Sequence, residues 1–565
     1  MDYSAELSRI LAPAAGIPAE EALLAIEIPS DPDLGDYAFP CFRLAARYRK
    51  APAAIAAELC GKIQKPPFVS DIKTAGAYIN FFLDKRYYIQ NILAEIQERG
   101  ESFGSGAQGA GLTVCVDYSS INIAKPFHMG HLSSTVIGNS LCRIYGFLGY
   151  KTVGINHLGD WGTQFGKLIV AYKRWGNKED VEKDSVNALL SLYVKFHEEA
   201  EKDESLEEEG RAWFKKIEDA DPEALGLFNW FKELTLREAA VIYDMLGIRF
   251  DSYDGESFYN DKMQPVIDEL KKKNLLVESE GAYVVPLDGY GLPPCMIVKS
   301  DGATLYATRD LAAAFYRKKT YGFHKCLYVV AYQQNLHFKQ LFAVLELMGC
   351  DWAKDCEHVA FGMVSLEDGT LSTRKGKVVF LKDVLDKAVE KTLAIIREKS
   401  PDLENKEETA RTVGVGAVVF DTLSAARIKD ITFSFDRVLD FDGETGPYVQ
   451  YTHARCASLL RRADFDFEAE EKDFSALDNP EAFAVAKLLY SFPETVRRAC
   501  EKNEPYLITK RITELAKAMN KYYYEHRIIT EDRRKSAARL LLARCVKTVI
   551  KTGLWLIGIG APERM

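Results

Sequence analysis

Several features that would place the chain in a special class are missing from its 565 residues. No apolar run approaches the roughly 20 residues that a membrane-spanning helix needs, and the start Met1-Asp2-Tyr3 does not open a signal peptide. Neither an internal repeat nor a low-complexity tract occurs, which argues against a solenoid and against a disordered chain. We therefore expect a folded protein that has no membrane partner.

Cysteine pairs and an excess of positive charge are missing as well. The eleven cysteines are scattered without a CxxC pair, which argues against a zinc ribbon and indicates reduced thiols in a cytoplasmic protein. We predict no metal site. The formal net charge is −9, whereas a general nucleic-acid coat would be basic, so a polyanionic partner must be bound by local patches.

The length allows roughly three or four domains of about 150 residues, and the hydrophobic content of 47% supports sizeable cores. Strand and helix patterns are mixed at the start, alternate in the middle and become helical at the end. We expect four regions: an α+β domain over 1–105, a Rossmann-like doubly wound α/β domain with a parallel sheet over 106–380 and a helical insertion near 178–250, a helical connecting domain over 381–440, and an all-α domain over 441–565.

Buried strands are predicted where short apolar runs are bounded by polar loops. In the middle of the chain such runs occupy 112–116, 152–155, 326–331 and 358–364. The first run is followed, after a polar loop, by a helical pattern that places on one face Ile137, Leu141, Ile144 and Leu148.

The polar loop Asp117–His131, with the sequence DYSSINIAKPFHMGH, is a candidate phosphate site. Ligands of open α/β sheets bind at the carboxyl ends of strands, and a helix N-terminus attracts anions. His128 and His131 are three positions apart, so both can face one anion, and Gly130 lets a phosphate approach the backbone. Two alternatives stay open: a zinc pair, which would need a third ligand, and two histidines packed in a core.

A second loop, Ser372–Lys377, supplies hydroxyl groups and the cations Arg374, Lys375 and Lys377 beside Gly376. A basic loop of this kind suits a leaving pyrophosphate, because its charge must be neutralised as it develops. Taken alone, the loop could equally be a solvated basic turn. The two loops together are far more specific than either.

Short sequences in both loops resemble the signatures of a known protein family. HMGH resembles the HIGH signature of class I aminoacyl-tRNA synthetases, and LSTRKG stands in the place of their KMSKS loop. The resemblance is to arginyl-tRNA synthetases in particular. It is carried by the longer sequences DYSSINIAKPFHMGH, NHLGDWGTQFGKL, YATRDLAAA, VVAYQQNLHF and TGPYVQYTHAR, by an early GDYA element and by a final PERM. The likeness covers nearly the whole chain and implies an arginine–tRNA ligase. The α+β domain would then bind tRNA, and the all-α domain would bind the anticodon.

The resemblance implies the following substrates and roles. ATP, which carries Mg²⁺, would be bound by Lys125, His128, Gly130, His131, Met363, Val364, Ser372, Thr373 and Lys375. Among these, the catalytic residues would be Lys125, His128, His131 and Lys375. L-arginine would be bound by Asp117, Asn122, Tyr306, Asp310 and Gln334. The partner tRNA(Arg) would be contacted by Asn80, Phe81, Tyr448, Tyr451, Tyr523 and Met565.

The chemistry of arginine agrees with the implied pocket. A guanidinium group is a planar fork of donors that carboxylates match best. We expect Asp310 to pair with the guanidinium and Asn122 to hold the α-amino end. A different role for Asp310, as an acid at a helix N-terminus, stays open. No insert long enough for an editing domain interrupts the catalytic region, and the charge of arginine allows discrimination without one.

Two departures from the family pattern bear on the mechanism. Thr373 stands where most class I enzymes have the second lysine of KMSKS, and Lys125 would supply the missing charge, with Lys375 as the rival. Ile121 stands where many relatives have proline, so the loop has more freedom in φ. We also expect a monomer. The alternative function is a catalytically silent, synthetase-like RNA-binding protein, and a third is an adenylyltransferase of small acids.

The two lysines can be separated by mutation. Lys125→Ala should slow the activation step more than Lys375→Ala does, because Lys125 is expected to provide the positive charge at the α-phosphate. The rate of arginine-dependent exchange between ATP and pyrophosphate measures this step. The reverse order would assign the compensating charge to the second loop.

Overall fold

The computed structural model describes residues 2–300, 306–366 and 379–565. These residues form two compact units. The first comprises residues up to 103 together with 452–492 and 514–550, and the second comprises 104–451, 493–513 and 551–565. Each unit is described separately below.

A four-stranded parallel sheet forms the centre of the second unit. Its strands are β4 (Thr113–Asp117), β5 (Lys151–Ile155), β9 (Lys325–Tyr328) and β10 (Cys356–His358), in the spatial order β10-β9-β4-β5. The chain runs outward from β4 to β5 and later, on the other side of β4, from β9 to β10. This reversal of direction is the arrangement of a doubly wound α/β fold, so the predicted fold class is confirmed.

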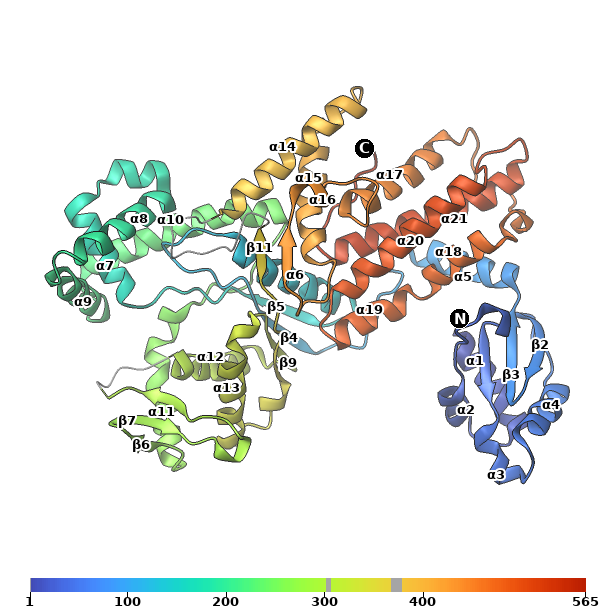
Figure 1. Cartoon of the computed structure of the whole chain (residues 1–565), viewed down its shortest axis with the longest axis horizontal. Coiled ribbons are helices and arrows are strands. Elements are labelled where there is room, and N and C mark those ends of the chain that lie inside the picture. The colour runs from blue at the N-terminus through green and yellow to red at the C-terminus, as the bar shows by residue number, and fades with distance from the viewer. Residues whose placement is uncertain (1, 301–305, 367–378) are drawn as a thin grey trace. The chain divides into compact units, whose positions relative to one another are not determined.

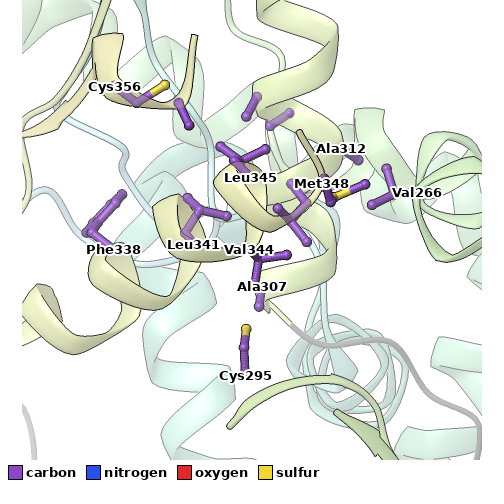
Figure 2. Close-up of a cluster of buried hydrophobic side chains, with 14 of the residues drawn as sticks. Val266, Cys295, Ala307, Ala312, Phe338, Leu341, Val344, Leu345, Met348 and Cys356 are labelled. Atoms are coloured by element: carbon purple, nitrogen blue, oxygen red, sulfur yellow. The ribbon is translucent and has the colours of Figure 1, made fainter. Parts of the chain in front are cut away.

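The helices beside this sheet are α6 (Leu132–Phe147), α12 (Tyr306–Tyr321) and α13 (Asn335–Leu347). In α6 the predicted face is buried, since Ile137, Leu141 and Ile144 are at most 2% exposed. Figure 2 shows Phe338, Leu341, Val344, Leu345 and Met348, at helical spacing along α13 and just beyond it, in one apolar cluster. The cluster also contains Val266, Cys295, Ala307, Ala312 and Cys356.

Four helices follow β5 and stand together at one end of the second unit (Figure 1). They are α7 (Thr163–Trp175), α8 (Lys178–Ala200), α9 (Ser205–Glu218) and α10 (Pro222–Leu246). After them come α11 (Met263–Lys272) and an antiparallel sheet in the order β6-β7-β8, formed by Val277–Ser279, Ala282–Val285 and Cys295–Val298.

The expected single strand over 358–364 is wrong. Strand β10 ends at His358, and β11 (Val364–Leu366) pairs with β12 (Ile431–Phe433) in a separate two-stranded sheet. Between the two strands, Gly362 donates its N–H to the carbonyl of Arg427 at 2.8 Å, and a Cβ on Gly362 would lie 2.3 Å from the Lys429 carbonyl oxygen. Within this continuous apolar run, the chain therefore crosses from the parallel sheet to the two-stranded sheet. Strand β12 also corrects the expectation that the chain is helical throughout after Val379.

The first unit contains a small antiparallel sheet in the order β1-β3-β2, formed by Tyr37–Pro40, Tyr78–Leu83 and Val69–Ala75. Its N-terminal helices are α1 (Tyr3–Ala15), α2 (Ala19–Ala25), α3 (Ala45–Tyr48), α4 (Pro52–Lys62) and α5 (Lys85–Arg99). The tyrosine of the GDYA element, Tyr37, is 6% exposed and lies in the core of this sheet.

Helices make up most of the remaining chain, as predicted for the C-terminal region. They are α14 (Leu381–Lys399), α15 (Lys406–Thr422), α16 (Phe435–Val438), α17 (Gly446–Arg462), α18 (Pro480–Tyr490), α19 (Phe492–Glu501), α20 (Tyr506–Glu525) and α21 (Arg533–Leu556). Within the described ranges, no helix combines the length and the apolar character needed to cross a membrane.

Candidate functional site

The predicted phosphate loop follows the carboxyl end of β4, a strand with a partner on each side. His128 and His131 lie at the end of the loop, around a short 3-10 turn that leads into α6. The Nδ1 of His128 accepts the backbone N–H of Gly130 at 3.0 Å, and the Nδ1 of His131 accepts the backbone N–H of His128 at 3.3 Å. Because both Nδ1 atoms accept, each neutral ring carries its proton on Nε2 and can donate it to a ligand.

Both imidazoles are held neutral. Burial, followed by the charge of Lys125, lowers the pKa of His128. Burial and the neighbouring His128 ring lower the pKa of His131 to about 3. The exposed Lys125 therefore supplies the positive charge of this loop, while the two rings, whose centroids are 3.9 Å apart, supply neutral donors. A cation beside two donors is suited to phosphate oxygens.

The shape of the loop is fixed by hydrogen bonds to two helices. Ser119, Ser120 and Ala124 have left-handed backbone conformations, with φ of 70°, 46° and 58°. The backbone N–H of Ser119 donates to Ser134 Oγ of α6 at 2.9 Å. The N–H of Ala124 donates to Thr235 Oγ1 of α10 at 3.0 Å. Such strained positions persist only where surrounding contacts determine them.

A second contact with α10 passes through Tyr243. Its hydroxyl lies 2.8 Å from Ser119 Oγ and accepts from Asn156 Nδ2 at 2.8 Å. The same helix bonds to the segment NHLGDWGTQ after β5, since Lys232 lies 2.6 Å from the fully buried Asp160. Helix α10 therefore helps to hold both the first loop and this segment.

Asp117, predicted to bind arginine, is bonded to the chain itself. Its Oδ2 lies 2.8 Å from Nη2 of Arg317, whose side chain is 1% exposed, and its Oδ1 accepts the Ser120 hydroxyl at 2.9 Å. Burial opposes the charge of Arg317, but the carboxylate of Asp117 and neighbouring groups raise its pKa well above the ordinary value. Asp117 thus anchors α12 to β4. Its contact with arginine stays a prediction.

Asp310 lies on α12 between two histidines that were not among the predicted site residues. Nε2 of His337, on α13, lies 2.7 Å from Oδ2 of Asp310, and Nε2 of His157, which follows β5, lies 3.8 Å from Oδ1. Burial raises the pKa of Asp310, but the hydrogen bond and charge of His337 outweigh it, so the pKa is below its ordinary value. The site therefore presents an ionised, partly buried carboxylate.

The other predicted arginine-binding residues are accessible. Tyr306 begins α12 and is 67% exposed, four positions before Asp310, so both can share one face of the helix. Gln334 ends the turn before α13 and is exposed, as is Asn122 in the first loop. A Cβ on Gly159 would lie 2.3 Å from Asn122 Oδ1, so a larger residue at position 159 would displace the Asn122 side chain.

The whole second loop, Ser372–Lys377, lies outside the described residues, and with it the predicted ATP-binding residues Ser372, Thr373 and Lys375. Before the loop, the backbone N–H of Met363 donates to Asp430 Oδ1 at 2.7 Å. The side chain of Met363 is 37% exposed, whereas that of Val364 is 8% exposed.

The predicted tRNA-binding residues differ in accessibility. Tyr451 is 40% exposed and Tyr523 is 36% exposed, with the guanidinium of Arg455 5.0 Å from the ring centre of Tyr523. Tyr448 and Met565 are partly buried. Asn80 and Phe81 are 4% and 0% exposed, so both side chains are buried, on opposite faces of β3.

His157 and His337 could have been suspected from the sequence. Both belong to phrases that carry the family resemblance, NHLGDWGTQFGKL and VVAYQQNLHF. Their convergence on Asp310 depends on three segments that are distant in the chain. Among the described residues, no group of three or more histidine, cysteine, aspartate or glutamate side chains could hold a metal ion.

Comparisons with known proteins cover the whole chain. Family models match at 1–83 (arginyl tRNA synthetase N terminal domain), 89–435 (tRNA synthetases class I (R), catalytic domain) and 449–565 (DALR anticodon binding domain). Arginine–tRNA ligase of Halothermothrix orenii is 54% identical over 97% of this chain and 96% of its own. That of Alkaliphilus metalliredigens is 53% identical over the full length of both. The structure of Thermus thermophilus arginyl-tRNA synthetase superposes with a TM-score of 0.79 at 26% identity, over the full length of both chains.

The low pKa of His131 predicts a specific acid sensitivity. Below about pH 6.5 the imidazole of residue 131 is protonated in the unfolded chain but stays neutral in the folded protein. The free energy of unfolding should therefore fall as the pH falls from about 6.5 towards 3. His131→Asn should remove this loss, by about 1–2 kcal/mol between pH 7 and pH 5. Urea unfolding at several pH values measures it, with His324→Asn at an exposed histidine as the control. Parallel pH profiles for wild type and His131→Asn would contradict the assignment.

Proposed function

The chain belongs to the arginyl-tRNA synthetases of class I, and from this membership we propose how its own residues carry out the arginine–tRNA ligase reaction. Its substrates are L-arginine, ATP and tRNA(Arg). The observation that carries the assignment of roles is the arrangement of two neutral imidazole donors, one lysine and a partly buried carboxylate around strands of one parallel sheet.

ATP binds at the first loop. The Nε2–H groups of His128 and His131 donate to phosphate oxygens, Gly130 permits close approach, and Lys125 lies at the α-phosphate. The backbone before the second loop, at Met363 and Val364, lines the nucleotide, and Ser372, Thr373 and Lys375 close over the β- and γ-phosphates. Mg²⁺ would be carried into the site by ATP and would help to neutralise the charge of the phosphates, with few protein ligands needed to hold it.

Arginine binds beside ATP. The guanidinium pairs with Asp310, Tyr306 and Gln334 provide further hydrogen bonds, and Asn122 holds the α-amino end. Asp117 contributes to the same site by pairing with Arg317, because this ion pair fixes the position of α12.

The reaction then needs positioning and charge stabilisation. A carboxylate oxygen of arginine attacks the α-phosphorus, the bond to pyrophosphate breaks, and arginyl-adenylate forms. Lys125 stabilises the negative charge that develops on the phosphate oxygens. A hydroxyl of the terminal ribose of tRNA next attacks the arginyl carbonyl carbon, and AMP leaves. No covalent enzyme intermediate takes part.

The remaining roles concern tRNA and the organisation of the chain. Tyr448, Tyr451, Tyr523 and Met565 contact the anticodon part of tRNA, where aromatic rings such as the partly exposed Tyr451 and Tyr523 can stack on bases. Asn80 and Phe81 belong to the N-terminal domain, which contacts the outer part of tRNA. The domain boundaries are 1–105, 106–380, 381–440 and 441–565, and the protein acts as a monomer in the cytoplasm.

Arginine-dependent pyrophosphate exchange tests the function. Exchange should occur with arginine and should be stimulated by tRNA, because enzymes of this family usually need tRNA for activation. Absence of exchange with and without tRNA would refute the catalytic function. Exchange driven better by another amino acid would refute the specificity.

The role of Asp310 is tested by its own variant. Asp310→Ala should raise the KM for arginine by about 10- to 100-fold and leave the KM for ATP nearly unchanged, because a charge-assisted hydrogen bond contributes roughly 1.5–3 kcal/mol. Asp310→Asn, which keeps the size of the side chain, separates the loss of charge from the loss of packing. Equal changes in the two KM values would refute the role.

A further inference from the structure

The hydrogen bond between His337 and Asp310 occupies an atom that a guanidinium would use. A guanidinium binds a carboxylate best through two parallel hydrogen bonds, one to each oxygen. In the structure, Oδ2 of Asp310 is 2.7 Å from Nε2 of His337, while Oδ1 is 3.8 Å from Nε2 of His157. One oxygen is therefore engaged and the other is beyond hydrogen-bond distance of its neighbour.

We propose that His337 is a positioning residue that holds the Asp310 carboxylate until arginine arrives, and that arginine binding releases a proton from His337. This inference rests on the proposed role of Asp310 in binding the guanidinium. The imidazolium and the guanidinium compete for the same carboxylate, and they repel each other when both are charged. The repulsion is removed, and the hold of His337 on the carboxylate is weakened, when His337 becomes neutral.

The protonation of His337 agrees with this coupling. Burial alone would lower its pKa, but the hydrogen bond and charge of Asp310 raise the pKa above its ordinary value. A bound guanidinium neutralises the Asp310 carboxylate and places a second positive charge beside His337. The pKa of His337 must therefore fall when arginine binds. By linkage, arginine then binds more weakly as the pH falls through the pKa of the free enzyme.

The pKa shifts of most other groups around this pair favour an unchanged charge as the pH rises. Burial lowers the pKa of His157 and of His358, which favours the neutral form of both rings. Burial raises the pKa of Cys295 to about 12, so its thiol also stays neutral. Arg317 keeps its positive charge and is paired with Asp117.

Glu256 is the one neighbour among the groups named here that titrates in the same range. Burial raises its pKa to about 7, and its Oε2 lies 4.0 Å from Nη1 of Arg309. Ionisation of Glu256 would also favour a cation at Asp310 as the pH rises. A variant at Glu256 is therefore needed to assign the effect.

The test is calorimetric titration of the full-length protein with arginine, from pH 6 to pH 8.5, in two buffers of different ionisation enthalpy. The wild type should release a large fraction of a proton per arginine near neutral pH, and its Kd should be about tenfold weaker at pH 6 than at pH 8.5. His337→Gln keeps a donor for Asp310 but does not titrate, so it should bind arginine with little pH dependence. Glu256→Gln, and His324→Gln at an exposed histidine, should retain the wild-type behaviour.

Two results would overturn the inference while leaving the proposed function intact: His337→Gln with the wild-type pH dependence, or Glu256→Gln without it. Failure of the wild type to bind arginine at any pH would instead refute the proposed function, and the inference with it. Should His337→Gln not fold, NMR titration of isotope-labelled histidines in the wild type replaces it. The pKa of His337 should then fall by at least about one unit on addition of arginine, and an unchanged pKa would overturn the inference.

Discussion

The buried ion pair between Asp117 and Arg317 is the contact on which the site depends. Two charges can be buried in this way only when they are paired, and removal of one partner leaves the other uncompensated, at a cost of about 3–5 kcal/mol. The pair connects the carboxyl end of β4 to α12, and the ring of Tyr328 lies 5.4 Å from the guanidinium. Asp310 precedes Arg317 by about two helical turns, so the pair also fixes the direction from which Asp310 approaches the sheet.

Local patterns in the sequence predicted most of the fold. Strands β4 and β5 lie within one residue of the predicted runs 112–116 and 152–155, and the predicted helical face with Ile137, Leu141 and Ile144 lies in α6, because apolar residues there follow the pattern of one element. The prediction over 358–364 failed for a physical reason. An apolar run shows that a segment is buried, but it carries no information on which strand lies beside it, and this segment leaves β9 for β12.

The site was predictable to the extent that it is local. His128 and His131 are three residues apart, and their common orientation follows from that spacing. The position of their protons does not, since it is set by the backbone N–H groups of Gly130 and His128. Likewise, the sequence indicates that Asp310 needs a cationic partner, but not that His337 fills this place before a substrate binds. Contacts of this kind, between segments that are distant in the chain, cannot be predicted from hydrophobic periodicity.

The three left-handed residues of the first loop affect how substrate binding energy is used. Ser119, Ser120 and Ala124 occupy conformations that glycine adopts without strain, yet none of them is glycine. Compared with glycine, these residues leave the unfolded loop fewer conformations to lose, and the bonds from α6 and α10 hold the loop in one of them. Folding has therefore already met the entropic cost of ordering this loop. Under the proposed function, the affinity of this loop for a nucleotide would not be reduced by that cost, and its contacts with the phosphates would remain available for the chemical step.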